Sequence, residues 1–172
     1  MNKWLEYCCF LTGKYPMNMK KIILLSVLLL IVGSVYSQAL EYSNGYYYKN
    51  GMLYTGTYTE YWPNKNVKLI ENISNGLENG ITEIYFENGK LEEQRSYLDG
   101  QKHGIWYTYF DSGAKIAEAN YRHDKKDGIW RIWDEKGTLR YEMYYSNGEK
   151  TGTWRVWDEK GKLTSERNYS AN

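Results

Sequence analysis

Two histidines are the residues of this chain best suited to acid–base chemistry or metal binding. His103 and His123 are the only histidines in the sequence, and imidazole is both a proton-transfer group near neutral pH and a common ligand of transition metals. No cysteine or further histidine accompanies them at the spacing of a metal site. The sequence therefore favours two solvent-exposed loop residues beside turns over a metal pair, and it predicts no metal site.

Carboxylates are plentiful, but their spacing argues against catalysis. Glycoside hydrolysis needs two carboxylates that flank a cleft, whereas Glu118, Glu142 and Glu166 recur at a fixed interval, as structural residues do. The segment Asp-Lys-Lys-Asp-Gly at 124–128 lacks the alternating ligands and the closing glutamate of a calcium loop, and a turn between repeats explains it better. The sequence offers no nucleophile–base pair and no phosphate-binding loop. We therefore expect no enzyme, no catalytic residue and no cofactor.

Aromatic side chains are the most serious candidates for a binding function, because the chain has seven tryptophans and 19 tyrosines. Such rings can stack on sugars or hold quaternary ammonium groups through cation–π contacts. They can equally be the buried part of a thin sheet, which has little else to bury. The sequence favours the second interpretation and leaves the first open.

The aromatic residues recur with a period of 24 residues, which indicates one small structural unit copied in tandem. Each copy is counted from a glycine at position zero, and aromatic residues follow at positions +2, +5 and +17, except for Thr82 at +2 of the second copy and Ile73 at +17 of the first. The glycines are Gly56, Gly80, Gly104, Gly128 and Gly152; the rings are Trp106, Trp130 and Trp154 at +2, Tyr109, Trp133 and Trp157 at +5, and Tyr97, Tyr121, Tyr145 and Tyr169 at +17.

Each copy contains two short runs of β-forming residues, such as 104–110 and 115–121, separated by a turn that contains glycine. This pattern predicts a β-hairpin, and no helical periodicity is present. We therefore predict an all-β fold: an elongated single-layer antiparallel sheet of tandem β-hairpins. Because Lys115 and Ile116 displace the apolar position by one residue, the strand register of the third copy stays open.

Positions +2 and +5 have opposite parity, so both faces of the sheet should carry rings, and rings of successive copies should pack on one another. We expect a ring to lie over the backbone of each period glycine. On this basis Gly128→Val should intrude under a packed ring. Glu118, Glu142 and Glu166 should accept hydrogen bonds between copies.

The motif resembles the bacterial variant of the MORN (membrane occupation and recognition nexus) repeat. The similarity is carried by Gly-x-Trp-x-x-Tyr/Trp at 104–109 and 152–157, and by Asn-Gly-Lys-Leu at 88–91. It covers about residues 46–170 and implies a row of hairpins with a non-enzymatic role in scaffolding, partner binding or membrane contact. Many bacterial proteins of this type are classed as antitoxin-like components of toxin–antitoxin modules.

The N-terminal part reads as separate from the repeats. Residues 19–37 have the basic start, apolar run and small residues of a secretory signal peptide that is cut after Ser37, with an uncleaved anchor as the alternative. Residues 1–18 are predicted to be an upstream extension outside the fold. Residues 38–55 form a partial repeat that leads into the array, and residues 56–172 form five repeats. The protein is therefore expected to be exported, to the periplasm, the outer envelope or the medium.

Loss of residues 1–37 removes four lysines and one glutamate, which takes the formal net charge from +1 to −2. A net acidic chain is a poor partner for nucleic acid. We expect a protein partner, bound in a scaffold role through the candidate interaction residues. An antitoxin or immunity function, and binding of glycan, choline or lipid at a membrane or cell wall, are the alternatives. The candidates are Tyr109, Trp133, Trp157, Arg131 and Arg155.

Overall fold

The computed structural model describes residues 40–169, which form strands and turns. The predicted extension 1–18 and the predicted signal peptide 19–37 lie outside the described residues. Within 40–169 there is no helix that is long and apolar enough to cross a membrane.

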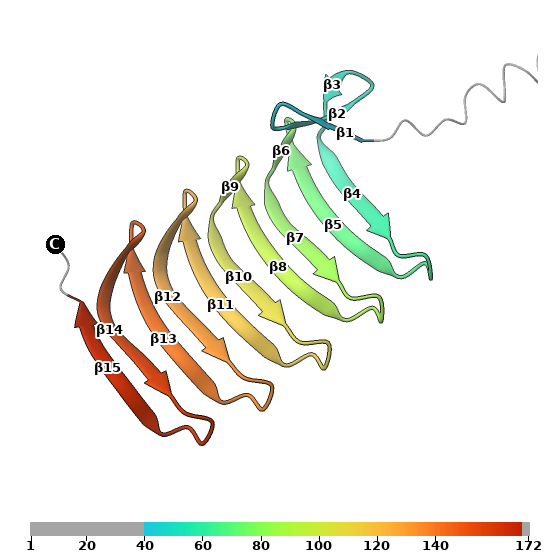
Figure 1. Cartoon of the computed structure of the whole chain (residues 1–172). Helices are drawn as coiled ribbons and strands as arrows, with labels where there is room; N and C mark the ends of the chain where they lie inside the picture. Colours follow the sequence, from blue (N-terminus) through green and yellow to red (C-terminus); the bar gives the residue numbers. More distant parts are fainter. Residues whose placement is uncertain (1–39, 170–172) are drawn as a thin grey trace, which may run out of the picture. The chain divides into compact units, whose positions relative to one another are not determined.

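Ten strands form five antiparallel hairpins that lie side by side in one sheet, as Figure 1 shows. The all-β prediction and the prediction of tandem hairpins are confirmed. Two short strands, β6 and β9, pair with the ends of β5 and β8, which brings the sheet to 12 strands. The bounds are β4 Gly56–Tyr61, β5 Val67–Ser74, β6 Leu77–Glu78, β7 Gly80–Tyr85, β8 Leu91–Leu98, β9 Gln101–Lys102, β10 Gly104–Tyr109, β11 Lys115–Arg122, β12 Lys125–Trp133, β13 Leu139–Ser146, β14 Glu149–Trp157 and β15 Leu163–Tyr169.

Three further short strands precede the array and form their own sheet: β1 Glu41–Ser43, β2 Tyr46–Lys49 and β3 Met52–Leu53. Backbone hydrogen bonds join this small sheet to the first hairpin. The Tyr47 N–H donates to the Gly76 carbonyl, and the Gly76 N–H donates to the Tyr54 carbonyl, both at 2.8 Å. The small sheet therefore sits against the turn that follows β5.

All five hairpins share one register, with a bulge before the turn. Tyr109 pairs with Lys115 in the third copy just as Trp133 pairs with Leu139 in the fourth. The displaced apolar position therefore leaves the register unchanged: Lys115 takes the place of a leucine.

The period glycine lies in a second bulge, where one copy meets the next. Between β11 and β12, Ala119 pairs with Trp130 and Tyr121 with Lys126, so two steps along β11 match four along β12. Gly128 lies in the longer stretch with φ of 103°, a conformation that residues with a Cβ rarely adopt. Sequence reasoning expected a ring over the backbone of each period glycine. A tyrosine ring does lie against Gly56 and Gly152, but the expectation is wrong at Gly80, Gly104 and Gly128. A Cβ on Gly128 would lie 3.1 Å from the Cβ of Asn120, not under a ring.

Little of the sheet is buried. Ile73 is the one buried hydrophobic side chain among residues 40–169, and Thr82 and Glu71 are the buried polar ones. A sheet with so small a core depends on side-chain pairs between neighbouring strands. The stability of the sheet therefore depends on the side-chain pairs on both of its faces.

Candidate interaction faces of the sheet

One face of the sheet, called here the aromatic face, carries a continuous row of alternating tyrosine and tryptophan rings. The +17 tyrosines and the +2 tryptophans contribute in turn, with neighbouring ring centroids 4.9–5.4 Å apart. These tilted contacts are typical of favourable aromatic pairs. The expected packing of rings between successive copies is confirmed on this face. The row runs Tyr97, Trp106, Tyr121, Trp130, Tyr145, Trp154, Tyr169.

Each +2 tryptophan also donates a hydrogen bond to a backbone carbonyl at the bulge beside it. The indole N–H groups of Trp106, Trp130 and Trp154 each donate to a backbone carbonyl of the preceding copy, all at 2.9 Å. These carbonyls lie where the bulge interrupts strand pairing, and an unmet carbonyl there would be costly. Sequence reasoning missed this role, because the acceptor is backbone and leaves no mark in the residue pattern.

Three lysines cap the row, one for each tryptophan. The Nζ atoms of Lys102, Lys126 and Lys150 lie 4.6, 4.1 and 4.6 Å from the centroids of Trp106, Trp130 and Trp154. Each lysine also faces the next tyrosine, at 4.8–5.4 Å. These are cation–π distances. Sequence reasoning missed them too, although their constant position +22 was a signal.

The same three lysines have no carboxylate partner in the described part of the chain. None of the nine ion pairs within residues 40–169 includes Lys102, Lys126 or Lys150. Lys150 is exposed and the other two are partly buried. The aromatic face therefore presents a row of positive charges that no carboxylate neutralises.

The opposite face, called here the ion-pair face, holds alternating arginines and glutamates. Arg131 lies between Glu118 at 3.5 Å and Glu142 at 3.0 Å. Arg155 lies between Glu142 at 3.4 Å and Glu166 at 2.8 Å. Glu142 thus accepts a hydrogen bond from the next copy, which confirms its expected role. Glu118 has an ion pair with the next copy, whereas Glu166 pairs with Arg155 of its own copy, so the expectation is wrong for Glu166.

The predicted interaction residues all lie on the ion-pair face. Arg131 and Arg155 are held by glutamates, and Tyr109, Trp133 and Trp157 are partly buried. The Nζ of Lys115 lies 4.4 Å from the Tyr107 ring and 5.5 Å from the Trp133 ring. In the described part of the chain the +5 rings make no ring–ring contact from copy to copy.

The N-terminal copies depart from this pattern. Thr82 takes the tryptophan position and Glu78 the lysine position, and the Tyr47 hydroxyl donates to Glu71 over 3.5 Å. Burial, together with the charge of Glu71, raises the pKa of Glu78 to about 7. Burial also raises the pKa of Glu71. This end of the sheet holds two crowded carboxyl groups where the other copies hold an ammonium group over rings.

The two histidines, expected to be solvent-exposed loop residues beside turns, lie side by side. His123 is exposed as expected, whereas His103 is partly buried. Their ring centroids are 5.1 Å apart, in an edge-to-face arrangement. His123 Nδ1 is bonded to Gln101 Oε1 at 2.8 Å, and His103 Nδ1 is buried without a partner. Within the described residues, however, no group of three metal-ligating side chains occurs.

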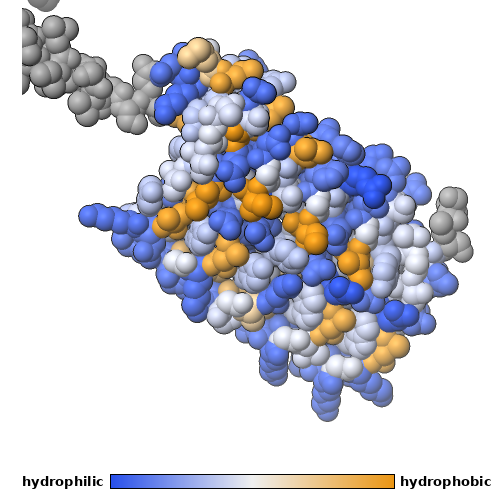
Figure 2. All heavy atoms as spheres, turned by 180° about the vertical axis from the view of Figure 1, so that it is seen from behind, coloured by the Kyte–Doolittle hydropathy of each residue, from blue (hydrophilic) through white to orange (hydrophobic). Residues whose placement is uncertain are grey.

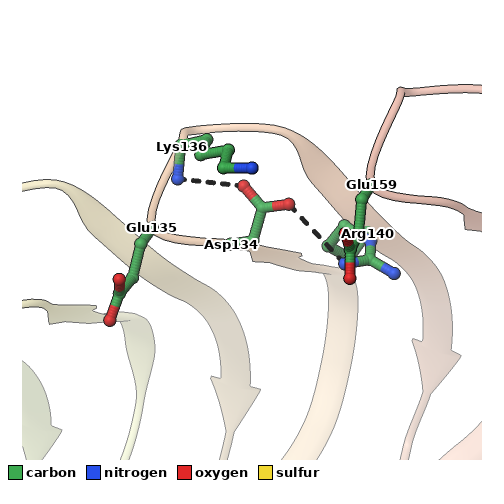
Figure 3. Close-up of a pocket in the computed structure, with 5 residues that line it drawn as sticks. All are labelled: Asp134, Glu135, Lys136, Arg140 and Glu159. Carbon is green, nitrogen blue, oxygen red and sulfur yellow. Dashed lines mark hydrogen bonds and ion pairs between the residues drawn. The ribbon is translucent and has the colours of Figure 1, made fainter.

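A small open hollow of about 270 Å³ lies between the turns of the last two hairpins. Figure 3 shows Asp134 between Lys136 and Arg140, two of the residues that line the hollow. Burial opposes ionisation of Asp134, but bonds from the N–H groups of Thr138 and Lys136 hold its pKa below its usual range. Asp134 therefore shapes its turn, and the hollow has the chemistry of a solvated turn.

Hydrophobic surface is scattered. On the side shown in Figure 2, hydrophobic residues form small separate patches among hydrophilic ones. The large hydrophobic side chains that are exposed include Tyr61, Ile105 and Tyr141 but none of the tryptophans within residues 40–169. This side therefore lacks a broad apolar surface for a partner, and charged groups are better placed than apolar ones to bind it.

Comparison with known protein families gives a match. The model of the MORN repeat variant matches five times, at residues 54–75, 78–99, 102–123, 126–147 and 150–171. No curated protein matches the chain. Repeats of this family generally mediate interactions with proteins or membranes and are not enzymes. Each match contains one hairpin together with the two residues that precede its period glycine. With five such units covering most of the sequence, the chain belongs to the MORN repeat variant family.

Proposed function

We propose that the protein is an exported interaction module that holds a protein partner in the cell envelope through its aromatic face. The observation that carries the proposal is the row of Lys102, Lys126 and Lys150, which have no carboxylate partner in the described part of the chain. Each ammonium group faces rings on one side and keeps N–H donors for a ligand. The row therefore suits an acidic protein surface.

The two faces differ in what they can offer such a partner. On the ion-pair face, Arg131 and Arg155 already neutralise glutamates, and a partner would have to break those pairs. On the aromatic face the tryptophans and tyrosines are held rigidly by their neighbours, so an acidic partner meets an ordered surface. Rigid aromatic anchors beside cations are common centres of binding energy.

Export is part of the proposal and is supported by the pattern of residues 19–37. The test is fractionation of intact cells into cytoplasm, envelope and medium, with determination of the N-terminal residue of the recovered protein. An N-terminus at Gln38 in the envelope or medium supports the proposal. A full-length chain in the cytoplasm contradicts it.

The binding test compares two triple variants in intact native cells. One replaces Lys102, Lys126 and Lys150 by glutamine, and the matched control replaces the turn lysines Lys136, Lys160 and Lys162 by glutamine. After mild crosslinking and affinity capture, we expect an exported protein at comparable stoichiometry with the parent chain and the control, and its loss with the first variant. Equal capture by both variants would contradict a role for the aromatic face.

Two other functions have their own tests. Choline binding is disfavoured, because the ring faces that would hold a quaternary ammonium group already face this chain's lysines. Sedimentation with the envelope without a protein partner, and saturable binding to liposomes or cell wall, would favour a glycan or lipid surface. A neighbouring toxin gene, with neutralisation lost in Trp130 or Trp154 variants that remain folded, would favour an antitoxin or immunity protein.

A further inference from the structure

The last described strand of the array, β15, is paired on one side, whereas equivalent strands in the sheet are paired on both sides. Among residues 40–169, β15 pairs with β14 alone. The equivalent strand one copy earlier, β13, pairs with β12 on one side and β14 on the other. The β13–β14 contact therefore gives a template for what the outer edge of β15 can accept.

The incomplete ion pairs show which charge fits. Glu118 and Glu142 each have two cationic partners, and their side chains are 17% and 14% exposed. Glu166 has one partner, Arg155, and its side chain is 50% exposed. The position beyond Glu166 corresponds to the place that Arg155 takes beside Glu142. An arginine from an added strand would complete the series.

The aromatic face ends in the same way. Tyr121 and Tyr145 each contact two tryptophans, whereas Tyr169 contacts Trp154 alone. Its second side is where the next tryptophan would lie. A tryptophan in the added strand, one position before the arginine, would fill this place. Trp154 and Arg155 occur in the same order on β14.

A second copy of this chain does not meet these requirements. The free first strand of a copy is β4, which carries Tyr58 and Thr59 at the tryptophan and arginine positions. The Tyr54 hydroxyl also donates to the Thr57 carbonyl at 3.0 Å and lies over Gly56, so part of that edge is covered. A symmetric pairing of two β15 strands centred on Glu166 would place like charges opposite each other, which is destabilising.

We propose that the outer edge of β15 accepts an extended segment of a protein partner by strand addition, and that this segment carries a tryptophan followed by an arginine. Backbone hydrogen bonds would supply affinity, and the Glu166 and Tyr169 side chains would select the sequence. This surface shares Tyr169 with the end of the aromatic row, where Lys150 lies over the ring, but it includes neither Lys102 nor Lys126.

The test uses a labelled peptide with the sequence of residues 148–158, which contains β14, and the full-length chain. Fluorescence anisotropy should show saturable binding. Glu166→Arg in the chain should weaken it roughly tenfold, because like charges then face each other. A peptide with glutamate in place of its arginine should restore binding to that variant. Glu159→Arg, which makes the same charge change in the neighbouring turn, should bind as the parent does.

Three controls keep the result interpretable. The thermal unfolding of Glu166→Arg is compared with that of Glu166→Gln, which removes the charge without reversing it and should weaken binding less. Hydrogen exchange should show new protection in β15. A variant with glutamine at Lys102 and Lys126, which lie away from β15, should bind the peptide normally, so failure of the proposed function and failure of this inference are distinguishable. Absence of binding, equal binding by Glu166→Arg, or protection of β13 through displacement of β14 would overturn the proposal.

Discussion

The first two hairpins and the last three have the same backbone register but different chemistry. In the last three, Trp130 and its equivalents alternate with tyrosines beneath lysines, and arginines alternate with glutamates on the other face. In the first two, Thr82 is fully buried and Glu78 lies where Lys102 and Lys126 lie later. The strand pairing of β7 with β8 nevertheless matches that of β12 with β13.

This comparison separates what the repeat requires from what it tolerates. Both regions keep the period glycine, the bulges and the turns. The side chains on the faces can differ in type: the last three hairpins carry aromatic pairs, and the first two carry a cluster of polar groups. The polar cluster occurs where the β1–β3 sheet contributes Tyr47 against Glu71. Burial there comes from the added sheet, so the wide rings are not needed.

The largest expected effect tests the shared requirement. Gly128→Val should destabilise the fold by about 3 kcal/mol or more, because it combines left-handed strain with a close contact. Gly80→Val should be milder: its φ of 102° is the same within a degree, but its nearest side-chain atom is 3.6 Å away instead of 3.1 Å. Thermal unfolding of both variants is the measurement. An unchanged melting temperature for Gly128→Val would contradict the account of this bulge.

The next effect concerns the aromatic row. Trp130→Ala should cost about 2–3 kcal/mol, somewhat below the value for a fully buried tryptophan, because two ring contacts and the hydrogen bond to the Asn120 carbonyl are lost. Trp130→Phe keeps a ring but not the indole N–H and should lose roughly half as much. Urea unfolding measures both. Equal losses would mean that the ring retained by phenylalanine contributes nothing, which would contradict the role given to the ring contacts.

The N-terminal copies should respond to pH in a way that the others do not. Because the folded-state pKa of Glu78 is raised to about 7 from 4.5, its neutral form is favoured by folding. Its stabilising contribution is therefore present below about pH 4.5 and is lost as the pH rises through about 7. We expect a loss of about 1–2 kcal/mol, reduced by the partial exposure of the group.

Hydrogen exchange of β5 and β7 between pH 5.5 and 8.5 checks this expectation. Glu78→Gln should flatten the dependence, and the remaining slope should have the same sign because burial also raises the pKa of Glu71. Equal slopes in β5 and β13 would indicate that the two regions do not differ in this respect.

The smallest effect concerns the ion-pair face. Glu142→Gln removes the carboxylate shared by Arg131 and Arg155 and should lower the melting temperature by about 2–4 °C at low salt. The loss should shrink in 1 M salt, where exposed charges are screened. Glu93→Gln, which removes a pair within one strand, should have less effect. A Glu142→Gln loss that does not depend on salt would argue against an electrostatic origin.

The sequence itself determined the period, the hairpins, the turn positions and the presence of rings on both faces. These features are local, because glycine-containing turns and two-residue alternation act within a few residues. The same information placed Trp106, Trp130 and Trp154 opposite Trp133 and Trp157.

Only the tertiary structure decided which side chains meet between copies. The bulge at the period glycine shifts the pairing of adjacent hairpins by two residues. At this bulge the tryptophan indole N–H groups donate hydrogen bonds to backbone carbonyls. At the far end of the bulge the lysines at position +22 lie over the rings. His103, which precedes the period glycine Gly104, lies beside His123. A residue pattern carries no measure of that shift, because it arises from backbone geometry at a residue without a side chain.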